Sequence, residues 1–205
     1  MCGIVGILGQ KAVAGDLVDA LRRLEYRGYD SAGIATVENG HLERIRAEGK
    51  LKNLELRLSN QPLQGHVGIG HTRWATHGKP VERNAHPHMN ERASVVHNGI
   101  IENFGELKKG LIAKGHRFET DTDTEVVVHL ISDEMAAGSD AVEATRKSLA
   151  KLQGAFALAI IFAGEDDLMI AARQAGQFAL DIRRSLNHEP VSAGPPGTTT
   201  LTEMA

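Results

Sequence analysis

The sequence predicts a layered α+β domain in which antiparallel sheets pack against helices. Strand-like apolar runs dominate the first half of the chain, three adjacent helical patterns follow, and two more strand-like runs come after them. This order argues against alternating βαβ units and a parallel sheet. The length of 205 residues, with 41% hydrophobic content, is that of one domain with a proper core.

The periodicity of the first half defines a series of short elements. In residues 13–27 the apolar positions Val13, Leu17, Leu21 and Leu24 share one face of a helix. Asn39-Gly40 is typical of a tight hairpin turn. The expected elements are a strand at 2–8, a helix at 13–27, strands at 33–39 and 41–49, a helix at 50–60, and strands at 66–74 and 93–101.

Helical patterns open the second half. Thr122 and Glu125 fit a capping box that would start the second of three helices. From Gln174 the chain is rich in Gly, Pro, Ser and Thr without either hydrophobic period, which predicts a flexible tail over 174–205. The expected elements are helices at 103–115, 122–138 and 140–154 and strands at 155–163 and 167–173.

Composition excludes several classes of protein. The formal charge is −3, so there is no basic excess of the kind that nucleic-acid binding needs. No apolar run approaches the roughly 18 to 20 residues of a membrane span, and the N-terminus lacks a charged segment followed by an apolar signal core, so we expect a cytoplasmic protein. A single cysteine builds neither an internal disulfide nor a Cys-rich zinc site.

That cysteine stands directly after the initiator methionine. Removal of Met1 would leave Cys2 with a free α-amine beside its thiol. An ordinary thiol has a pKa of about 8.5 and an α-amine about 7.7 to 8.0, so the amine can accept the thiol proton near neutral pH. This is the logic of an N-terminal nucleophile. The alternative interpretation is a small apolar residue at the start of a buried strand.

Five segments, the first of which begins with Cys2, carry a family resemblance. They are CGIVGI at 2–7, LRRLEYRGYDSAG at 21–33, GHTRWATHG at 70–78, HNGIIEN at 97–103 and TDTEV at 122–126. In content, order and spacing they resemble the class II glutamine amidotransferases, and within these the isomerising glutamine:fructose-6-phosphate amidotransferase branch. The resemblance covers residues 2–173. It implies a four-layer αββα sandwich of the N-terminal nucleophile hydrolases, without a cofactor or metal.

The resemblance also implies the parts of a glutaminase site. Cys2 would attack the side-chain amide of L-glutamine, while Asn98 and the backbone N–H of Gly99 would hold the oxyanion. The implied substrate-binding residues are Arg73 for the carboxylate, Asp123 for the α-ammonium, and Trp74, Thr76, His77 and Arg27 around them. A guanidinium suits a carboxylate because it offers two parallel hydrogen bonds.

Each of these residues also has an ordinary structural interpretation. Arg73 could be a surface arginine beside Trp74, and Asn98-Gly99 alone would be a hairpin turn. Asp123 would fall in the first turn of a helix, where a carboxylate complements the dipole. Arg27 could instead cap last-turn carbonyls.

Two further motifs carry no site. His66, His71, His77, His86, His88 and His97 lack the spacing of a zinc or iron site, and the early glycines match no nucleotide-binding fingerprint.

The chain departs from the family pattern after Arg173. The family continues with a GSPL-like segment and more strands, then two sugar-phosphate-binding domains, whereas this chain runs into QAGQFALDIRR. We therefore expect a truncated domain that lacks its last strands, and fructose 6-phosphate would be reached only through the missing isomerase half. Two alternatives remain open: an ammonia-supplying subunit of another amidotransferase, and an inactive glutamine-binding fragment.

Overall fold

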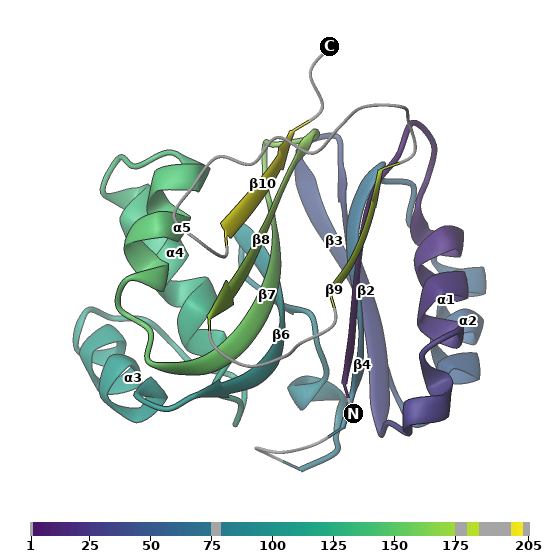
Figure 1. The fold of residues 1–205 in the computed structure, drawn as a ribbon, viewed down its shortest axis with the longest axis horizontal. Helices are drawn as coiled ribbons and strands as arrows, with labels where there is room; N and C mark the ends of the chain where they lie inside the picture. Colours follow the sequence, from purple (N-terminus) through teal and green to yellow (C-terminus); the bar gives the residue numbers. More distant parts are fainter. Residues whose placement is uncertain (1, 75–78, 175–179, 185–197, 203–205) are drawn as a thin grey trace.

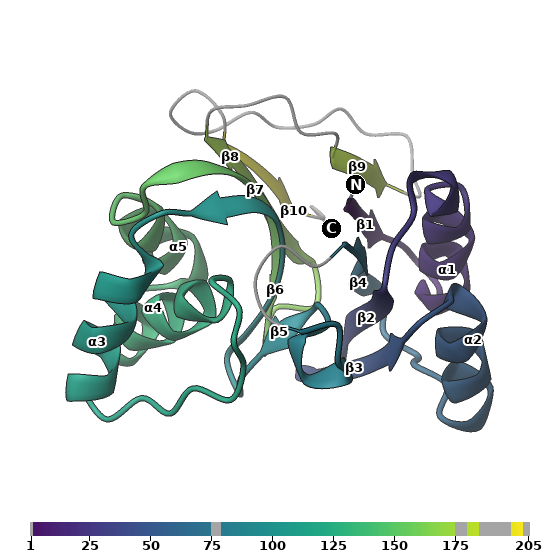
Figure 2. The same ribbon diagram turned by 90° about the horizontal axis from the view of Figure 1, so that it is seen from below.

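Two β-sheets face each other between two layers of helices (Figures 1 and 2). The computed structural model describes residues 2–74, 79–174, 180–184 and 198–202. The first sheet has the order β3-β2-β4-β1-β9, with β1 (Gly3–Leu8), β2 (Ser31–Glu38), β3 (His41–Glu48), β4 (Val67–Arg73) and β9 (Leu180–Arg184). The second has the order β10-β8-β7-β6-β5, with β5 (His88–Met89), β6 (Ala93–Ile101), β7 (Gly154–Phe162), β8 (Leu168–Gln174) and β10 (Thr198–Thr202).

The helices lie on the outer faces of the sheets (Figure 2). The first sheet is covered by α1 (Ala14–Arg22) and α2 (Leu51–Asn60), and the second by α3 (Phe104–Ala113), α4 (Glu125–Ala136) and α5 (Ala141–Leu149). Two short 3-10 helices, η1 (Glu25–Arg27) and η2 (Glu82–Asn84), lie in the connections. The predicted four-layer sandwich is confirmed. Among the described residues, no helix is long and apolar enough to cross a membrane.

The β2–β3 hairpin turns where the sequence predicts it. Asn39 and Gly40 both have positive φ, 51° and 77°, as a two-residue turn between twisted strands requires. The flanking strands stay in register from Glu38↔His41 to Ser31↔Glu48.

The side chains of β4 alternate between the two faces of the first sheet, and this alternation places a group of polar residues between the sheets. Successive side chains of a strand point to opposite faces, so every second residue of β4 faces the other sheet. Val67 and Ile69 join the apolar cluster between the sheets. His71 and Arg73 continue this face, and both are buried. The apolar filling between the sheets therefore gives way to polar side chains at the end of β4.

Asn98 and Gly99 lie inside β6, so the hairpin-turn interpretation is wrong. They pair with Ala157 and Phe156 of β7 in a ladder that runs unbroken to Ile101. Gly99 has φ 118°, and a Cβ there would stand 2.1 Å from the carbonyl oxygen of Ala155. Only glycine fits this backbone.

The predicted capping box is also wrong. Helix α4 begins at Glu125, and its N-cap residue Thr124 makes no side-chain cap. The Thr122 hydroxyl is instead paired with His88 Nε2 at 3.1 Å. Asp123 therefore precedes the helix and does not lie in its first turn.

The two edge strands β9 and β10 come from the segment expected to be a tail. Strand β9 runs parallel to β1, which makes the first sheet mixed at this edge, and β10 pairs antiparallel with β8. Residues 175–179, 185–197 and 203–205 lie outside the described part of the chain, and the domain boundary at 173 stays a prediction.

Candidate active site

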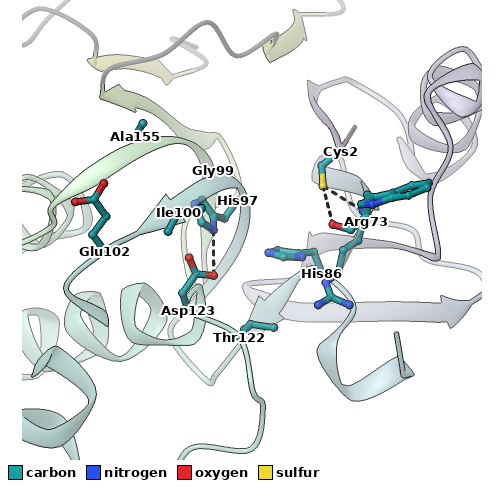
Figure 3. A pocket seen from close by; sticks show the side chains of 11 residues that line it. Cys2, Arg73, His86, His97, Gly99, Ile100, Glu102, Thr122, Asp123 and Ala155 are labelled. Atoms are coloured by element: carbon teal, nitrogen blue, oxygen red, sulfur yellow. Dashed lines mark hydrogen bonds and ion pairs between the residues drawn. The ribbon is translucent and has the colours of Figure 1, made fainter. Parts of the chain in front are cut away.

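A cavity of about 390 Å³ opens between the two sheets and collects most of the predicted site (Figure 3). Cys2 directly precedes β1 and Arg73 ends β4, both on the side of the first sheet, whereas Gly99 lies in β6 and Asp123 in the segment before α4. The lining residues are Cys2, Arg73, Trp74, His86, His97, Gly99, Ile100, Glu102, Thr122, Asp123 and Ala155.

The Cys2 thiol is half-buried against the end of β4. Its sulfur accepts a hydrogen bond from the backbone N–H of Trp74 at 3.1 Å, and Asn98 Nδ2 donates to the Cys2 carbonyl at 3.3 Å. Burial raises the pKa of the thiol, and the Trp74 N–H and the charge of Arg73 offset only part of this effect. The thiol is therefore protonated at neutral pH and needs a base before it can attack.

Arg73 is buried at the wall of the cavity, so the surface-arginine interpretation is wrong. The residue is only 3% exposed. Its Nη1 lies 3.6 Å from Asp30 Oδ1 and donates to the carbonyl of Lys79 at 3.4 Å. Its neighbour Trp74 is 54% exposed although it also lines the cavity. A buried guanidinium at a cavity wall suits a carboxylate ligand.

Asp123 occupies the opposite wall (Figure 3). Its Oδ2 accepts the backbone N–H of Ile101 at 2.9 Å, and its Oδ1 lies 3.7 Å from His97 Nδ1. Strand β6 thus fixes a buried carboxylate that faces the cavity from the side opposite Arg73. One wall suits a carboxylate and the other an ammonium, the two charged groups of a free amino acid.

Buried histidines form a layer at the cavity wall, where His86 and His97 line the cavity. His86 Nε2 and His97 Nδ1 both lie 2.9 Å from the hydroxyl of Thr124, and the rings of His71 and His86 are 4.3 Å apart. Burial lowers the pKa of His71 to about 3, so that ring is neutral. Burial also lowers the pKa of His86 and His88 well below the ordinary value.

From the sequence, we interpreted these histidines only as possible metal ligands. Among the described residues, no three His, Cys, Asp or Glu side chains come together as a metal site. Their contribution as buried hydrogen-bonding groups was missed. One signal could have found part of it, because His71 and Arg73 are two residues apart on a strand and so share a face.

Three predicted residues cannot be placed. Thr76 and His77 lie outside the described residues, and the side chain of Arg27 is likewise outside the described part, although its backbone belongs to η1. Their substrate-binding roles stay predictions.

Comparison with known proteins now defines the class. The sequence model of the family described as "Glutamine amidotransferase domain" matches residues 71–189, more than half of the chain. The chain belongs to the glutamine amidotransferase family.

Particular relatives narrow this class. Over 198 residues the chain is 60% identical to the glutamine–fructose-6-phosphate aminotransferase [isomerizing] of Bradyrhizobium diazoefficiens. This alignment covers 95% of this chain and 33% of that protein. It is 63% identical over 180 residues to the enzyme of that name from Brucella suis, and this alignment covers 88% of this chain and 30% of that protein. The chain thus spans about a third of the length of these relatives.

A solved structure has the same fold. Glutamine phosphoribosylpyrophosphate amidotransferase from B. subtilis, complexed with ADP and GMP, matches with a TM-score of 0.69 and 28% identity, over 84% of this chain and 36% of that one. This identity is less than half of that to the fructose-6-phosphate aminotransferases. The predicted membership of the class II amidotransferases, and the closer resemblance to the isomerising branch, are confirmed.

Proposed function

We propose that this chain hydrolyses L-glutamine to glutamate and ammonia in the cavity between the sheets, with Cys2 as nucleophile. The proposal is best supported by one observation: a single space of about 390 Å³ is lined by a thiol, a buried guanidinium, a glycine backbone and a buried carboxylate. Arg73 would bind the substrate carboxylate and Asp123 the α-ammonium, which presents the side-chain amide to Cys2.

The reaction starts with a proton transfer, because burial keeps the thiol protonated. After removal of Met1, the α-amine of Cys2 takes this proton and the sulfur attacks the amide carbon. The carbonyl electrons move to oxygen, and Asn98 Nδ2–H and the Gly99 N–H hold the resulting oxyanion.

Collapse of this intermediate breaks the carbon–nitrogen bond and forms a thioester. The protonated amine gives its proton to the departing nitrogen, which leaves as ammonia. Water then adds to the thioester, its proton passes through the amine to the sulfur, and glutamate is released with the thiol restored. No step needs a metal or an organic cofactor.

For the longer relatives, the name implies that ammonia passes to fructose 6-phosphate. We extend this acceptor to the ammonia that the present chain would release, which a separate isomerase part would use to make glucosamine 6-phosphate. The cytoplasmic location expected from the sequence stays a prediction.

The test is the intact mass of the purified chain before and after exposure to a glutamine-like chloroketone, together with glutamate release. A chain without Met1 that gains one label, is protected by glutamine and releases glutamate supports the proposal. The Cys2→Ala variant should fold, take no label and release none. A chain that has lost Met1, takes no label and binds glutamine in calorimetry would point to an inactive glutamine-binding fragment. A co-purifying synthase other than the isomerase would point to a different ammonia acceptor.

A further inference from the structure

We infer that His71 is a positioning residue, which fixes the direction in which the Asn98 carboxamide faces and so aims its N–H groups toward Cys2. The inference deepens the proposed function, since it rests on Asn98 as a donor to the oxyanion. It follows from two hydrogen bonds of one side chain, considered in turn.

The first bond settles which end of the carboxamide is nitrogen. A backbone carbonyl oxygen can only accept, and the Cys2 carbonyl lies 3.3 Å from the Asn98 amide. The group that faces it must therefore be the NH₂. Its opposite end, Oδ1, then faces Nε2 of His71 at 2.8 Å.

The second bond settles the tautomer of the histidine. Oδ1 of a carboxamide only accepts, so His71 Nε2 must carry the proton. Burial lowers the pKa of the ring to about 3, so it holds a single proton at neutral pH and Nδ1 has none. Nδ1 is buried and makes no hydrogen bond in the described structure.

The packing explains why this arrangement is rigid. His71 belongs to β4 and Asn98 to β6, so the hydrogen bond spans the space between the two sheets. The His71 ring packs against the ring of His86, which Thr124 holds through its hydroxyl. A fully buried ring between these neighbours has one orientation, and it imposes that orientation on Asn98.

The consequence concerns the reaction rather than the fold alone. Without the His71 bond, the carboxamide is held only by the Cys2 carbonyl at 3.3 Å. It can then turn over, and its oxygen would face the Cys2 carbonyl and the developing oxyanion. A preorganised donor stabilises the transition state because it needs no reorganisation during the reaction. His71 therefore acts through Asn98 and touches no reacting atom.

The test compares His71→Leu with His71→Gln in the processed chain. Loss of one oxyanion donor costs about 10²- to 10³-fold in kcat, and a misdirected donor loses part of this. We expect His71→Leu to lower kcat by roughly 10- to 100-fold, with KM for glutamine and Cys2 alkylation by iodoacetamide within about twofold. Glutamine at this position offers an N–H near the place of Nε2, so His71→Gln should restore much of kcat.

A double-mutant cycle separates positioning from general disruption. In an Asn98→Ala background, the His71→Leu change should lower kcat little further, because residues that act as one unit are not additive. The matched control is His88→Gln, a buried histidine of the same layer whose partner is Thr122, and it should keep kcat within about twofold. Equal losses from His71→Leu in both backgrounds, or no loss in the parent, would overturn the inference.

A readout independent of turnover distinguishes this inference from the proposed function. In nitrogen-15 NMR of the Cys2→Ala chain, His71 should show the Nε2–H tautomer without titrating between pH 5.5 and 8.5. An Nδ1–H tautomer would refute the inference even if the parent is active. The expected tautomer in a chain that releases no glutamate would leave the geometry standing and refute the reaction.

Discussion

Cys2 and Trp74 meet across 72 residues of sequence, where the backbone N–H of Trp74 donates to the Cys2 sulfur at 3.1 Å. The antiparallel register of β1 and β4 produces this contact, because Gly3 pairs with Thr72 and the next positions outward are Cys2 and Arg73. The same register brings the nucleophile beside the arginine proposed to hold the substrate carboxylate. Strand pairing alone thus assembles one wall of the site.

The pH dependence of Cys2 alkylation follows from its burial. Burial raises the pKa of the thiol, so in a chain that keeps Met1 the rate of reaction with iodoacetamide should rise with a midpoint above about 8.5, the ordinary value. Mass spectrometry between pH 6 and 11 measures this rate. The same chain unfolded in guanidinium is the control, and a folded midpoint at or below the unfolded one would contradict the prediction.

Arg73→Lys should damage substrate binding although it keeps the charge. An ammonium cannot form the two parallel hydrogen bonds of a guanidinium with a carboxylate, and bonds to charged groups contribute about 1.5 to 3 kcal/mol. We expect KM for glutamine to rise roughly 10- to 100-fold, because each 1.4 kcal/mol is tenfold. Steady-state glutamate release gives KM, and Arg92→Lys, at an exposed position, is the control. An unchanged KM would exclude Arg73 from carboxylate binding.

The sequence predicted an element correctly where neighbouring residues alone determine its conformation. The Asn39-Gly40 turn depends on backbone preferences of two residues, and the alternation of β4 depends on period 2, so both could be predicted. The Thr122 capping box failed because both of its side chains bind other partners, and one of these, His88, is distant in sequence. His88 binds the Thr122 hydroxyl, and the Glu125 carboxylate is taken by the 119–120 backbone.

Part of the candidate site could be predicted from the sequence, and part of it could not. Cys2, Arg73, Gly99 and Asp123 were predicted from motif resemblance, and the cavity collects them. The link from His71 to Asn98 joins strands of different sheets, so no spacing along the chain encodes it. A histidine is also compatible with metal binding, catalysis or a satisfied core position, and only the neighbours of its ring decide among these.

Glu125 should make stability depend on acid pH. Burial alone would raise the pKa of this carboxyl, but the His129 ring 3.6 Å away and hydrogen bonds from the N–H groups of Glu119 and Thr120 and from the Thr120 hydroxyl outweigh it and lower the pKa to about 2. A lowered folded pKa gives stability that is present above the unfolded value of about 4.3 and is lost as pH falls toward 2.

The matching variant is Glu125→Gln. It should lower the free energy of unfolding at pH 7 by about 1 to 3 kcal/mol, since an amide cannot accept all of these bonds. The gap between parent and variant should close as pH falls from about 4.5 to 2, as measured by urea unfolding at each pH. Glu43→Gln, at an exposed position of β3, should show neither effect. A gap that stays constant with pH would mean that shape rather than charge is responsible.

Gly99→Ala should destabilise the fold and abolish turnover together. The residue has φ 118°, and the new Cβ would meet the Ala155 carbonyl oxygen at 2.1 Å, so strand β6 must shift away from β7. Backbone strain of this kind costs about 1 to 3 kcal/mol, and displacement of the Gly99 N–H removes a proposed oxyanion donor.

Gly110→Ala is the matched control, because this glycine lies in α3 with open space around it and the change should stabilise the helix by about 1 kcal/mol. Urea unfolding and glutamate release measure both variants. A Gly99→Ala chain with parental stability and turnover would mean that the backbone at this position is not constrained as described.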